Sequence, residues 1–142
     1  MKKLVYCFAK DKMKVLDKLE DQSEPLIKHL VKYFLYPNHL SSSHWGDEIF
    51  SFLNNVSKLK KKNKRPTSEV ILKSTWNVYE DSILEYIPTV QEDYGISYVD
   101  SKTVYNDCKQ YMVWLAEKLS DVGSVSRNSC KCKLKEIEGA NR

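Results

Sequence analysis

Apolar side chains recur at helical spacing in several stretches of this chain, and this periodicity predicts most of its secondary structure. Between Leu26 and Leu35, apolar residues come in pairs one turn apart, which is typical of a helix packed into a bundle. The stripe from Val104 to Val122 keeps a spacing of three to four residues for about five turns. The helices predicted in this way span residues 4–20, 23–36, 44–62, 68–87 and 101–122. For residues 4–8 a strand is the alternative.

Proline, glycine and capping residues mark where these helices begin and end. Ser23 is a good N-cap, and Pro37 disfavours helical geometry at the residue before it. Pro88 is expected to end the fourth helix, leaving residues 88–99 as a loop with one helical turn. Gly123 suits the position after the last helix. No stripe is evident beyond it.

The chain of 142 residues suits a single domain. The predicted fold class is all-α, a compact bundle or orthogonal array of about five helices with a frayed C-terminal tail. The helical domain is expected over residues 1–123, and residues 124–142 are expected to be a polar, Lys-rich, flexible tail.

Neither a membrane segment nor a metal site is expected. No apolar run reaches the length of about 18 residues that spans a bilayer, and Lys10 interrupts the short apolar stretch near the N-terminus. We therefore expect a cytoplasmic protein that does not bind membranes. Cys130 and Cys132 lack the second ligand pair of a structural zinc site, and Cys108 fits the core. No cofactor is expected either, because no phosphate-binding or metal-binding motif occurs.

Charge is distributed unevenly along the chain. Residues 1–65 hold 14 Lys and Arg against 7 Asp and Glu. Residues 66–100 hold a single Lys against 7 acidic residues, and residues 101–142 return to a basic balance of 8 against 5. The acidic segment also contains several tyrosines, whose rings provide contact area with a polar tip. This combination favours a binding protein over an enzyme.

The first functional hypothesis is a protein-binding inhibitor, of the immunity or antitoxin type found in bacteria, that neutralises a basic toxin or nuclease. Clustered carboxylates speed the encounter with a basic partner, and tyrosines suit protein interfaces. The alternative for the same residues is a solvated face with its tyrosines partly packed inward. The expected partner-binding residues are Tyr79, Glu80, Asp81, Glu85, Tyr86, Glu92, Asp93, Tyr94 and Tyr98.

A second hypothesis is a nucleic-acid-binding regulatory protein. It would contact phosphates through a basic run that contains no aromatic residue for stacking on bases. It ranks second because the acidic segment would repel a phosphate chain. The residues of this run are Lys58, Lys60, Lys61, Lys62, Lys64 and Arg65.

An enzyme ranks last. Its site would lie around His39, His44, Asp47 and Glu48, where His44 and the two acids can share one helix face. However, carboxylates in a first helical turn are already explained by the helix dipole. No catalytic residue is therefore assigned. The richness in Lys, Asn, Ile and Tyr favours an AT-rich source, which is common in mobile or phage-derived DNA.

Overall fold

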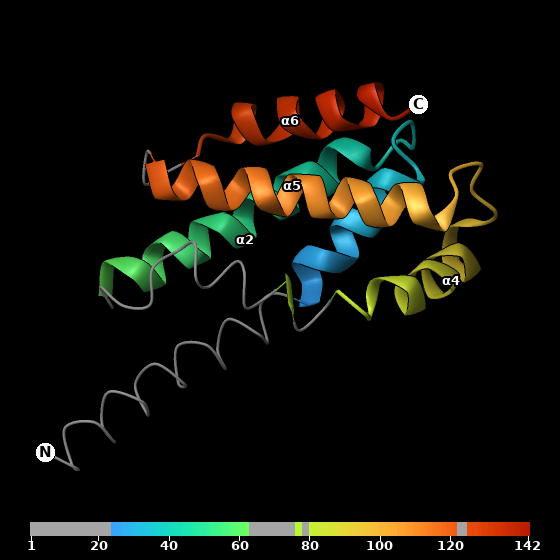
Figure 1. The fold of residues 1–142 in the computed structure, drawn as a ribbon, viewed down its shortest axis with the longest axis horizontal. Helices are drawn as coiled ribbons and strands as arrows, with labels where there is room; N and C mark the ends of the chain where they lie inside the picture. Colours follow the sequence, from blue (N-terminus) through green and yellow to red (C-terminus); the bar gives the residue numbers. More distant parts are fainter. Residues whose placement is uncertain (1–23, 63–75, 78–79, 122–124) are drawn as a thin grey trace, which may run out of the picture.

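The structure is a computed structural model that describes residues 24–62, 76–77, 80–121 and 125–142 (Figure 1). Helices cover most of these residues, and no strand occurs among them. The prediction of an all-α fold is therefore confirmed. The helices span residues 24–35, Ser42–Lys62 (α2), Ile83–Tyr94 (α4), Ser101–Asp121 (α5) and Arg127–Ala140 (α6).

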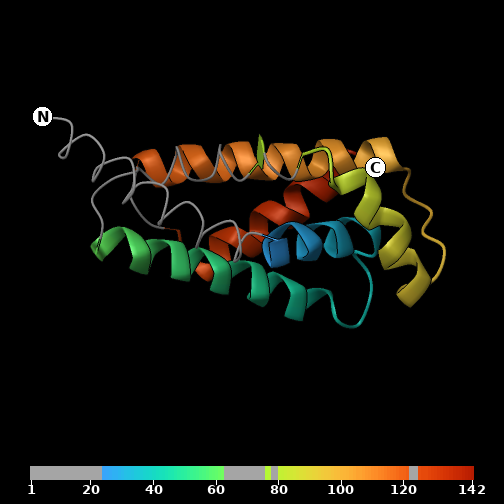
Figure 2. The ribbon, with the colours of Figure 1, turned by 90° about the horizontal axis from the view of Figure 1, so that it is seen from below.

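The helices form a compact bundle. After α5 the chain turns back, so that α6 runs along α5 in the opposite direction (Figure 1). Figure 2 shows α5 along one side and α2 along the other, with helix 24–35 and α6 between them. Helix α4 packs on α5 and crosses one end of the bundle. Within the described part of the chain, none of the helices combines enough length and apolar character to cross a bilayer.

The stripes found in the sequence meet in one hydrophobic core. Helix 24–35 contributes the most buried side chains to this core, because its paired apolar positions form a wide apolar face. The largest fully buried side chains are Phe34, Tyr111, Leu26, Ile27, Leu30, Ile49, Ile83, Leu115 and Leu134. Leu134 lies in the region expected to be a tail, so the core extends beyond the boundary predicted at residue 123.

The prediction of a flexible tail over residues 124–142 is wrong. Residues 127–140 form α6, and Ser126 caps its start by accepting a hydrogen bond from the Ser129 N–H at 3.1 Å. Cys130, Leu134 and Ile137 recur one turn apart and are buried against α2 and α5. Gly46 of α2 faces α6 at this contact: a Cβ there would lie 3.4 Å from the Cγ of Lys131, in ordinary van der Waals contact.

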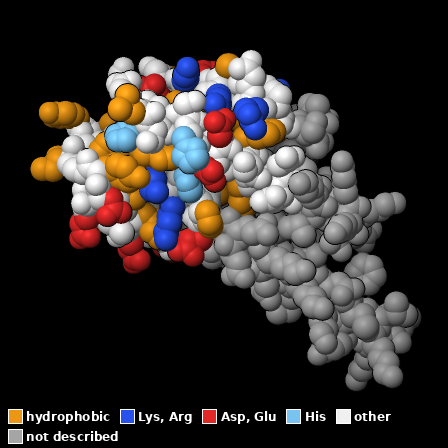
Figure 3. Space-filling model, turned by 180° about the vertical axis from the view of Figure 1, so that it is seen from behind, with side chains coloured by type: hydrophobic (Ala, Val, Ile, Leu, Met, Phe, Trp, Pro, Cys, Tyr) orange, Lys and Arg blue, Asp and Glu red, His pale blue; other side chains and the backbone are white. Residues whose placement is uncertain are grey.

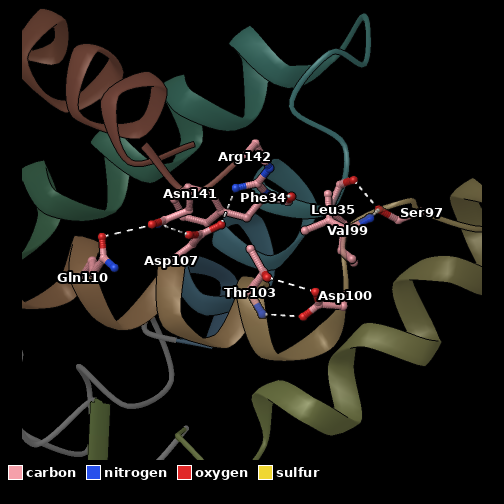
Figure 4. Close-up of polar contacts among 10 residues, drawn as sticks. All are labelled: Phe34, Leu35, Ser97, Val99, Asp100, Thr103, Asp107, Gln110, Asn141 and Arg142. Atoms are coloured by element: carbon pink, nitrogen blue, oxygen red, sulfur yellow. Dashed lines mark hydrogen bonds and ion pairs between the residues drawn. The ribbon is translucent and has the colours of Figure 1, made fainter. Parts of the chain in front are cut away.

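Polar contacts hold the end of α6 against the bundle (Figure 4). Asp107 of α5 is completely buried, and its carboxylate accepts 2.6 Å hydrogen bonds from the Asn141 amide and the Arg142 guanidinium. Arg142 also donates to the carbonyl of Phe34 at 2.6 Å. A buried carboxylate is costly unless it is paired and hydrogen-bonded, and these contacts satisfy both needs. We call Asp107, Asn141, Arg142 and the Phe34 carbonyl the C-terminal clamp.

The predicted end of the fourth helix at Pro88 is also wrong, because α4 continues through Pro88 to Tyr94. A proline inside a helix removes one backbone hydrogen bond, here the one to the carbonyl of Leu84. Pro88 lies on the exposed side of α4, so that carbonyl can turn to water instead. The helices predicted over residues 4–20 and at the start of 68–87 lie outside the described residues.

Candidate protein-binding surface

Four exposed carboxylates are spread along the solvent side of α4 and the turn before it. Helix α4 buries Ile83, Ile87 and Val90, and with 3.6 residues per turn the opposite side carries Glu85 and Glu92. Asp93 lies beside Glu92, and Asp81 lies in the turn that leads into the helix. All four side chains are exposed. We call Asp81, Glu85, Glu92 and Asp93 the acidic face.

The last turn of α4 is negative for two reasons that add together. The C-terminal end of a helix carries a partial negative charge, so carboxylates there are disfavoured and lysines or arginines are favoured. Glu92 and Asp93 nevertheless occupy this turn, and it contains no basic residue. Local stability does not explain this placement, and sites that break a local rule are often functional.

The acidic face is not neutralised by ion pairs within the described part of the chain. The ion pairs found there involve other acids, such as Asp47 with Lys131 and Glu24 with Lys28. None of them includes Glu85, Glu92 or Asp93. Figure 3 shows acidic side chains gathered at one edge of the molecule. The field of this edge is therefore available to attract a positive group.

The tyrosines of the acidic segment are placed unequally. Tyr98 is fully exposed, and Tyr94 is 38% exposed at the end of α4. Tyr86 is half-buried, with the Lys28 ammonium 5.3 Å from its ring centre. Burial is the main cause that raises the pKa of Tyr86. Tyr79 lies outside the described residues. Tyr94 and Tyr98 are thus the rings best placed to meet a partner.

Glu80 has a structural contact that separates it from the acidic face. Its carboxylate accepts a hydrogen bond from the hydroxyl of Tyr105 on α5. This bond favours the neutral phenol and raises the pKa of Tyr105 to about 12. Glu80 therefore joins the segment before α4 to α5. It was expected among the partner-binding residues, and its role in binding stays a prediction beside this contact.

The residues around His44 also make contacts between helices. Asp47 forms ion pairs with Lys131 at 2.8 Å and Arg127 at 3.7 Å, both from α6. The hydrogen bond from Lys131 holds the pKa of Asp47 below its usual range. His44 lies 3.7 Å from Glu48 on the exposed side of α2. No cluster that could hold a metal ion occurs in the described part of the chain.

The basic run is only partly visible. Residues 58–62 form the last turns of α2, which is the helix predicted for them. Their side chains, and all of Lys64 and Arg65, lie outside the described residues. Nucleic-acid binding through Lys58, Lys60, Lys61, Lys62, Lys64 and Arg65 therefore stays a prediction.

Two loops beside the acidic face form a surface that sequence reasoning missed. Loop 36–41 and loop 95–99 lie together, because the Tyr36 hydroxyl donates to the Gly95 carbonyl and the Ser97 hydroxyl donates to the Leu35 carbonyl at 2.6 Å. A cavity of about 570 Å³ opens between them. The sequence carries a weak signal for this surface, namely the single apolar residues Leu40 and Ile96 inside polar loops. Helical periodicity does not detect such isolated residues.

Comparisons of the chain with protein-family models, curated proteins and solved structures found no match. The function of this chain is therefore inferred from the chemistry of this surface. Its elements are exposed carboxylates at the C-terminal end of α4, two accessible tyrosine rings and an adjoining pair of loops.

Proposed function

We propose that this chain is a protein-binding inhibitor, of the immunity or antitoxin type, that neutralises a basic toxin or nuclease. The observation that carries the proposal is the pair Glu92 and Asp93, exposed in the last turn of α4 where the helix dipole disfavours them. An exposed arrangement that costs stability in the free protein is explained if a positive partner neutralises it on binding.

The acidic face would act mainly on the rate of encounter. Complementary charge raises association rates by about 10- to 1,000-fold, and the gain falls as salt is added. The basic active site of a nuclease, which attracts phosphates, is the kind of surface that such a face would cover. Tyr94 and Tyr98 would then supply contact area close to the carboxylates.

The test uses two variants with the same change in net charge. In the first, Glu92→Lys and Asp93→Lys reverse the acidic face. In the second, Glu117→Lys and Glu136→Lys reverse two exposed acids on α5 and α6. Each protein is used to isolate partners from the native host, and association rates with the isolated partner are measured at several salt concentrations.

We expect the isolated partner to be basic. The first variant should associate with it at least about tenfold more slowly, and this difference in association rate should shrink as salt is added. The second variant should associate almost as fast as the unaltered chain. Equal rates for both variants would remove the acidic face from the mechanism. Salt-sensitive binding of the unaltered chain to random DNA or RNA would instead support the nucleic-acid hypothesis.

A further inference from the structure

Three large apolar side chains project into solvent from the paired loops. Leu40, Ile96 and Tyr98 are each at least 91% exposed. Single exposed apolar residues are common in proteins, but a group of them on one surface marks a binding site. In Figure 3, apolar side chains protrude at the same edge of the molecule as the acidic ones. We call Leu40, Ile96 and Tyr98 the loop tip.

The loops that carry the tip are firmly supported. The His39 ring stacks on Trp45 with centroids 5.1 Å apart, and the Tyr94 ring packs edge-on against both. His39 also accepts the Ser41 N–H at 3.0 Å, and Val99 donates its N–H to the Ser97 hydroxyl at 3.1 Å. A surface that is fixed before binding loses little conformational entropy when a partner docks.

The surroundings of the loop tip are negative. Between Ser74 and Ser101 the sequence contains no Lys or Arg, and two of the three tip residues, Ile96 and Tyr98, closely follow Glu92 and Asp93. Arg142 lines the cavity between the loops, but its guanidinium is bound to Asp107 and to the Phe34 carbonyl. Lys32 lies 5.7 Å from the centre of the Tyr94 ring. On the α4 side, where Glu92 and Asp93 outnumber Lys32, the partner for the tip is expected to be apolar at its centre and positive at its border.

We propose that the loop tip is an apolar anchor that binds a protein surface made of an apolar patch bordered by Lys and Arg. This inference rests on the proposed function, since it places the anchor and the acidic face on the same partner. The carboxylates attract the partner and set the association rate. The anchor removes apolar surface from water and sets how long the complex lasts.

A second cavity lies between α5 and α6, with a volume of about 700 Å³. It is bordered by Lys109 and Lys133 as well as Glu117, so its charges are mixed. Half-exposed Val113 lies in it and offers a matched apolar position away from the loops. This cavity gives the experiment a built-in comparison.

The probes are two synthetic cationic peptides. The first is a helix with Leu and Trp on one face and Lys elsewhere, and the second carries Ser in place of each Leu and Trp. Each peptide is titrated into the full isotope-labelled chain, and backbone amide shifts are followed by NMR. The variants Ile96→Ser, Tyr98→Ser, Glu92→Lys with Asp93→Lys and, as control, Val113→Ser are titrated in parallel.

If the loop tip is an anchor, the apolar peptide should shift the amide resonances of loops 36–41 and 95–99. It should also bind more tightly than the Ser peptide. Ile96→Ser and Tyr98→Ser should each weaken it about tenfold, as expected for losing one buried apolar side chain. Val113→Ser should leave its affinity unchanged. Shifts centred on the α5–α6 cavity, or equal affinity for all variants, would overturn the proposal.

Failure of the anchor can be told apart from failure of the proposed function. If both peptides bind equally and only Glu92→Lys with Asp93→Lys weakens them, the acidic face stands and the anchor is wrong. If neither peptide perturbs α4 or the loops, both proposals fail. Sedimentation of the free chain tests whether the loop tip binds a second copy of the chain. If the chain is a dimer that Ile96→Ser dissociates, the tip is a self-interface and the anchor proposal is overturned.

Discussion

The side of the molecule where α6 covers α2 and α5 handles its charges differently from the end of α4. On the α6 side, Asp107 is clamped by Arg142, and Asp47 is paired with Lys131. At the end of α4, Glu92 and Asp93 face solvent in a helical turn that contains no basic residue. The first arrangement stabilises the fold, whereas the second is unfavourable in the isolated protein. The difference separates residues that hold the structure from residues available for recognition.

The strongest test of the supporting side is Leu134→Ala in α6. Leu134 is fully buried, so the truncation should destabilise the protein by about 3 kcal/mol, through lost burial and the cavity left behind. Urea unfolding measures the change. Leu84→Ala is the control, because this leucine on α4 is about half exposed and should cost little. Equal small losses would mean that α6 does not contribute to the core.

The next largest effect is expected from Arg142→Ala in the C-terminal clamp. Removing the guanidinium leaves the buried Asp107 with only the Asn141 amide, at a cost of about 2 kcal/mol. The matched control is Arg127→Ala, whose ion pair with Asp47 is exposed and should contribute less than about 1 kcal/mol. Chemical unfolding of both variants compares a buried with an exposed pair. Similar values would contradict the importance of burial.

A smaller effect of opposite sign is expected at the end of α4. Glu92→Lys with Asp93→Lys places positive charge where the helix dipole favours it, so the free protein should become more stable by about 0.5 kcal/mol. Thermal unfolding at low salt measures the gain, which should shrink as salt is added. A loss of stability would show that these carboxylates support the fold and would remove the main argument for a binding role.

The smallest effect concerns pH and the start of α5. The Thr103 N–H and hydroxyl donate to Asp100 at 2.8 and 3.1 Å, and the hydrogen bond from the N–H is the main cause that holds the pKa of Asp100 below 3.8. A lowered pKa in the folded state stabilises the protein above the unfolded value, and this stability is lost as pH falls through the folded value. Asp100→Ala should therefore flatten the fall in stability below pH 3.8. An unchanged acid slope would argue against this cap.

Periodicity in the sequence predicted the helices whose apolar stripes are continuous. The helix predicted over 44–62 is observed as Ser42–Lys62, and the one over 101–122 as Ser101–Asp121. Helix α6 was missed because its buried stripe is only Cys130, Leu134 and Ile137, set among charged residues. The cap at Ser126 and the regular spacing of those three residues were the available signals. Pro88 misled the prediction because its effect depends on whether its side of the helix faces water.

The candidate surface was predictable in part. Charge counting located the acidic segment, and helical geometry then places Glu85 and Glu92 on one side of α4. Sequence alone could not separate Glu80 from this group, because its partner Tyr105 lies 25 residues away. The pairing of loops 36–41 and 95–99 was equally hidden, since the contact from Ser97 to Leu35 spans 62 residues. Contacts of this kind depend on how the helices pack.

Gly95 makes the course of the following loop depend on one backbone torsion. Its φ of 94° and ψ of −179° suit glycine and little else, although a Cβ there would meet no atom within 4 Å. An added methyl group would shift φ toward negative values and turn Ile96 and Tyr98 away from loop 36–41. Descendants of this chain that bind different partners are therefore expected to change residues 96 and 98 freely while they keep the glycine before them.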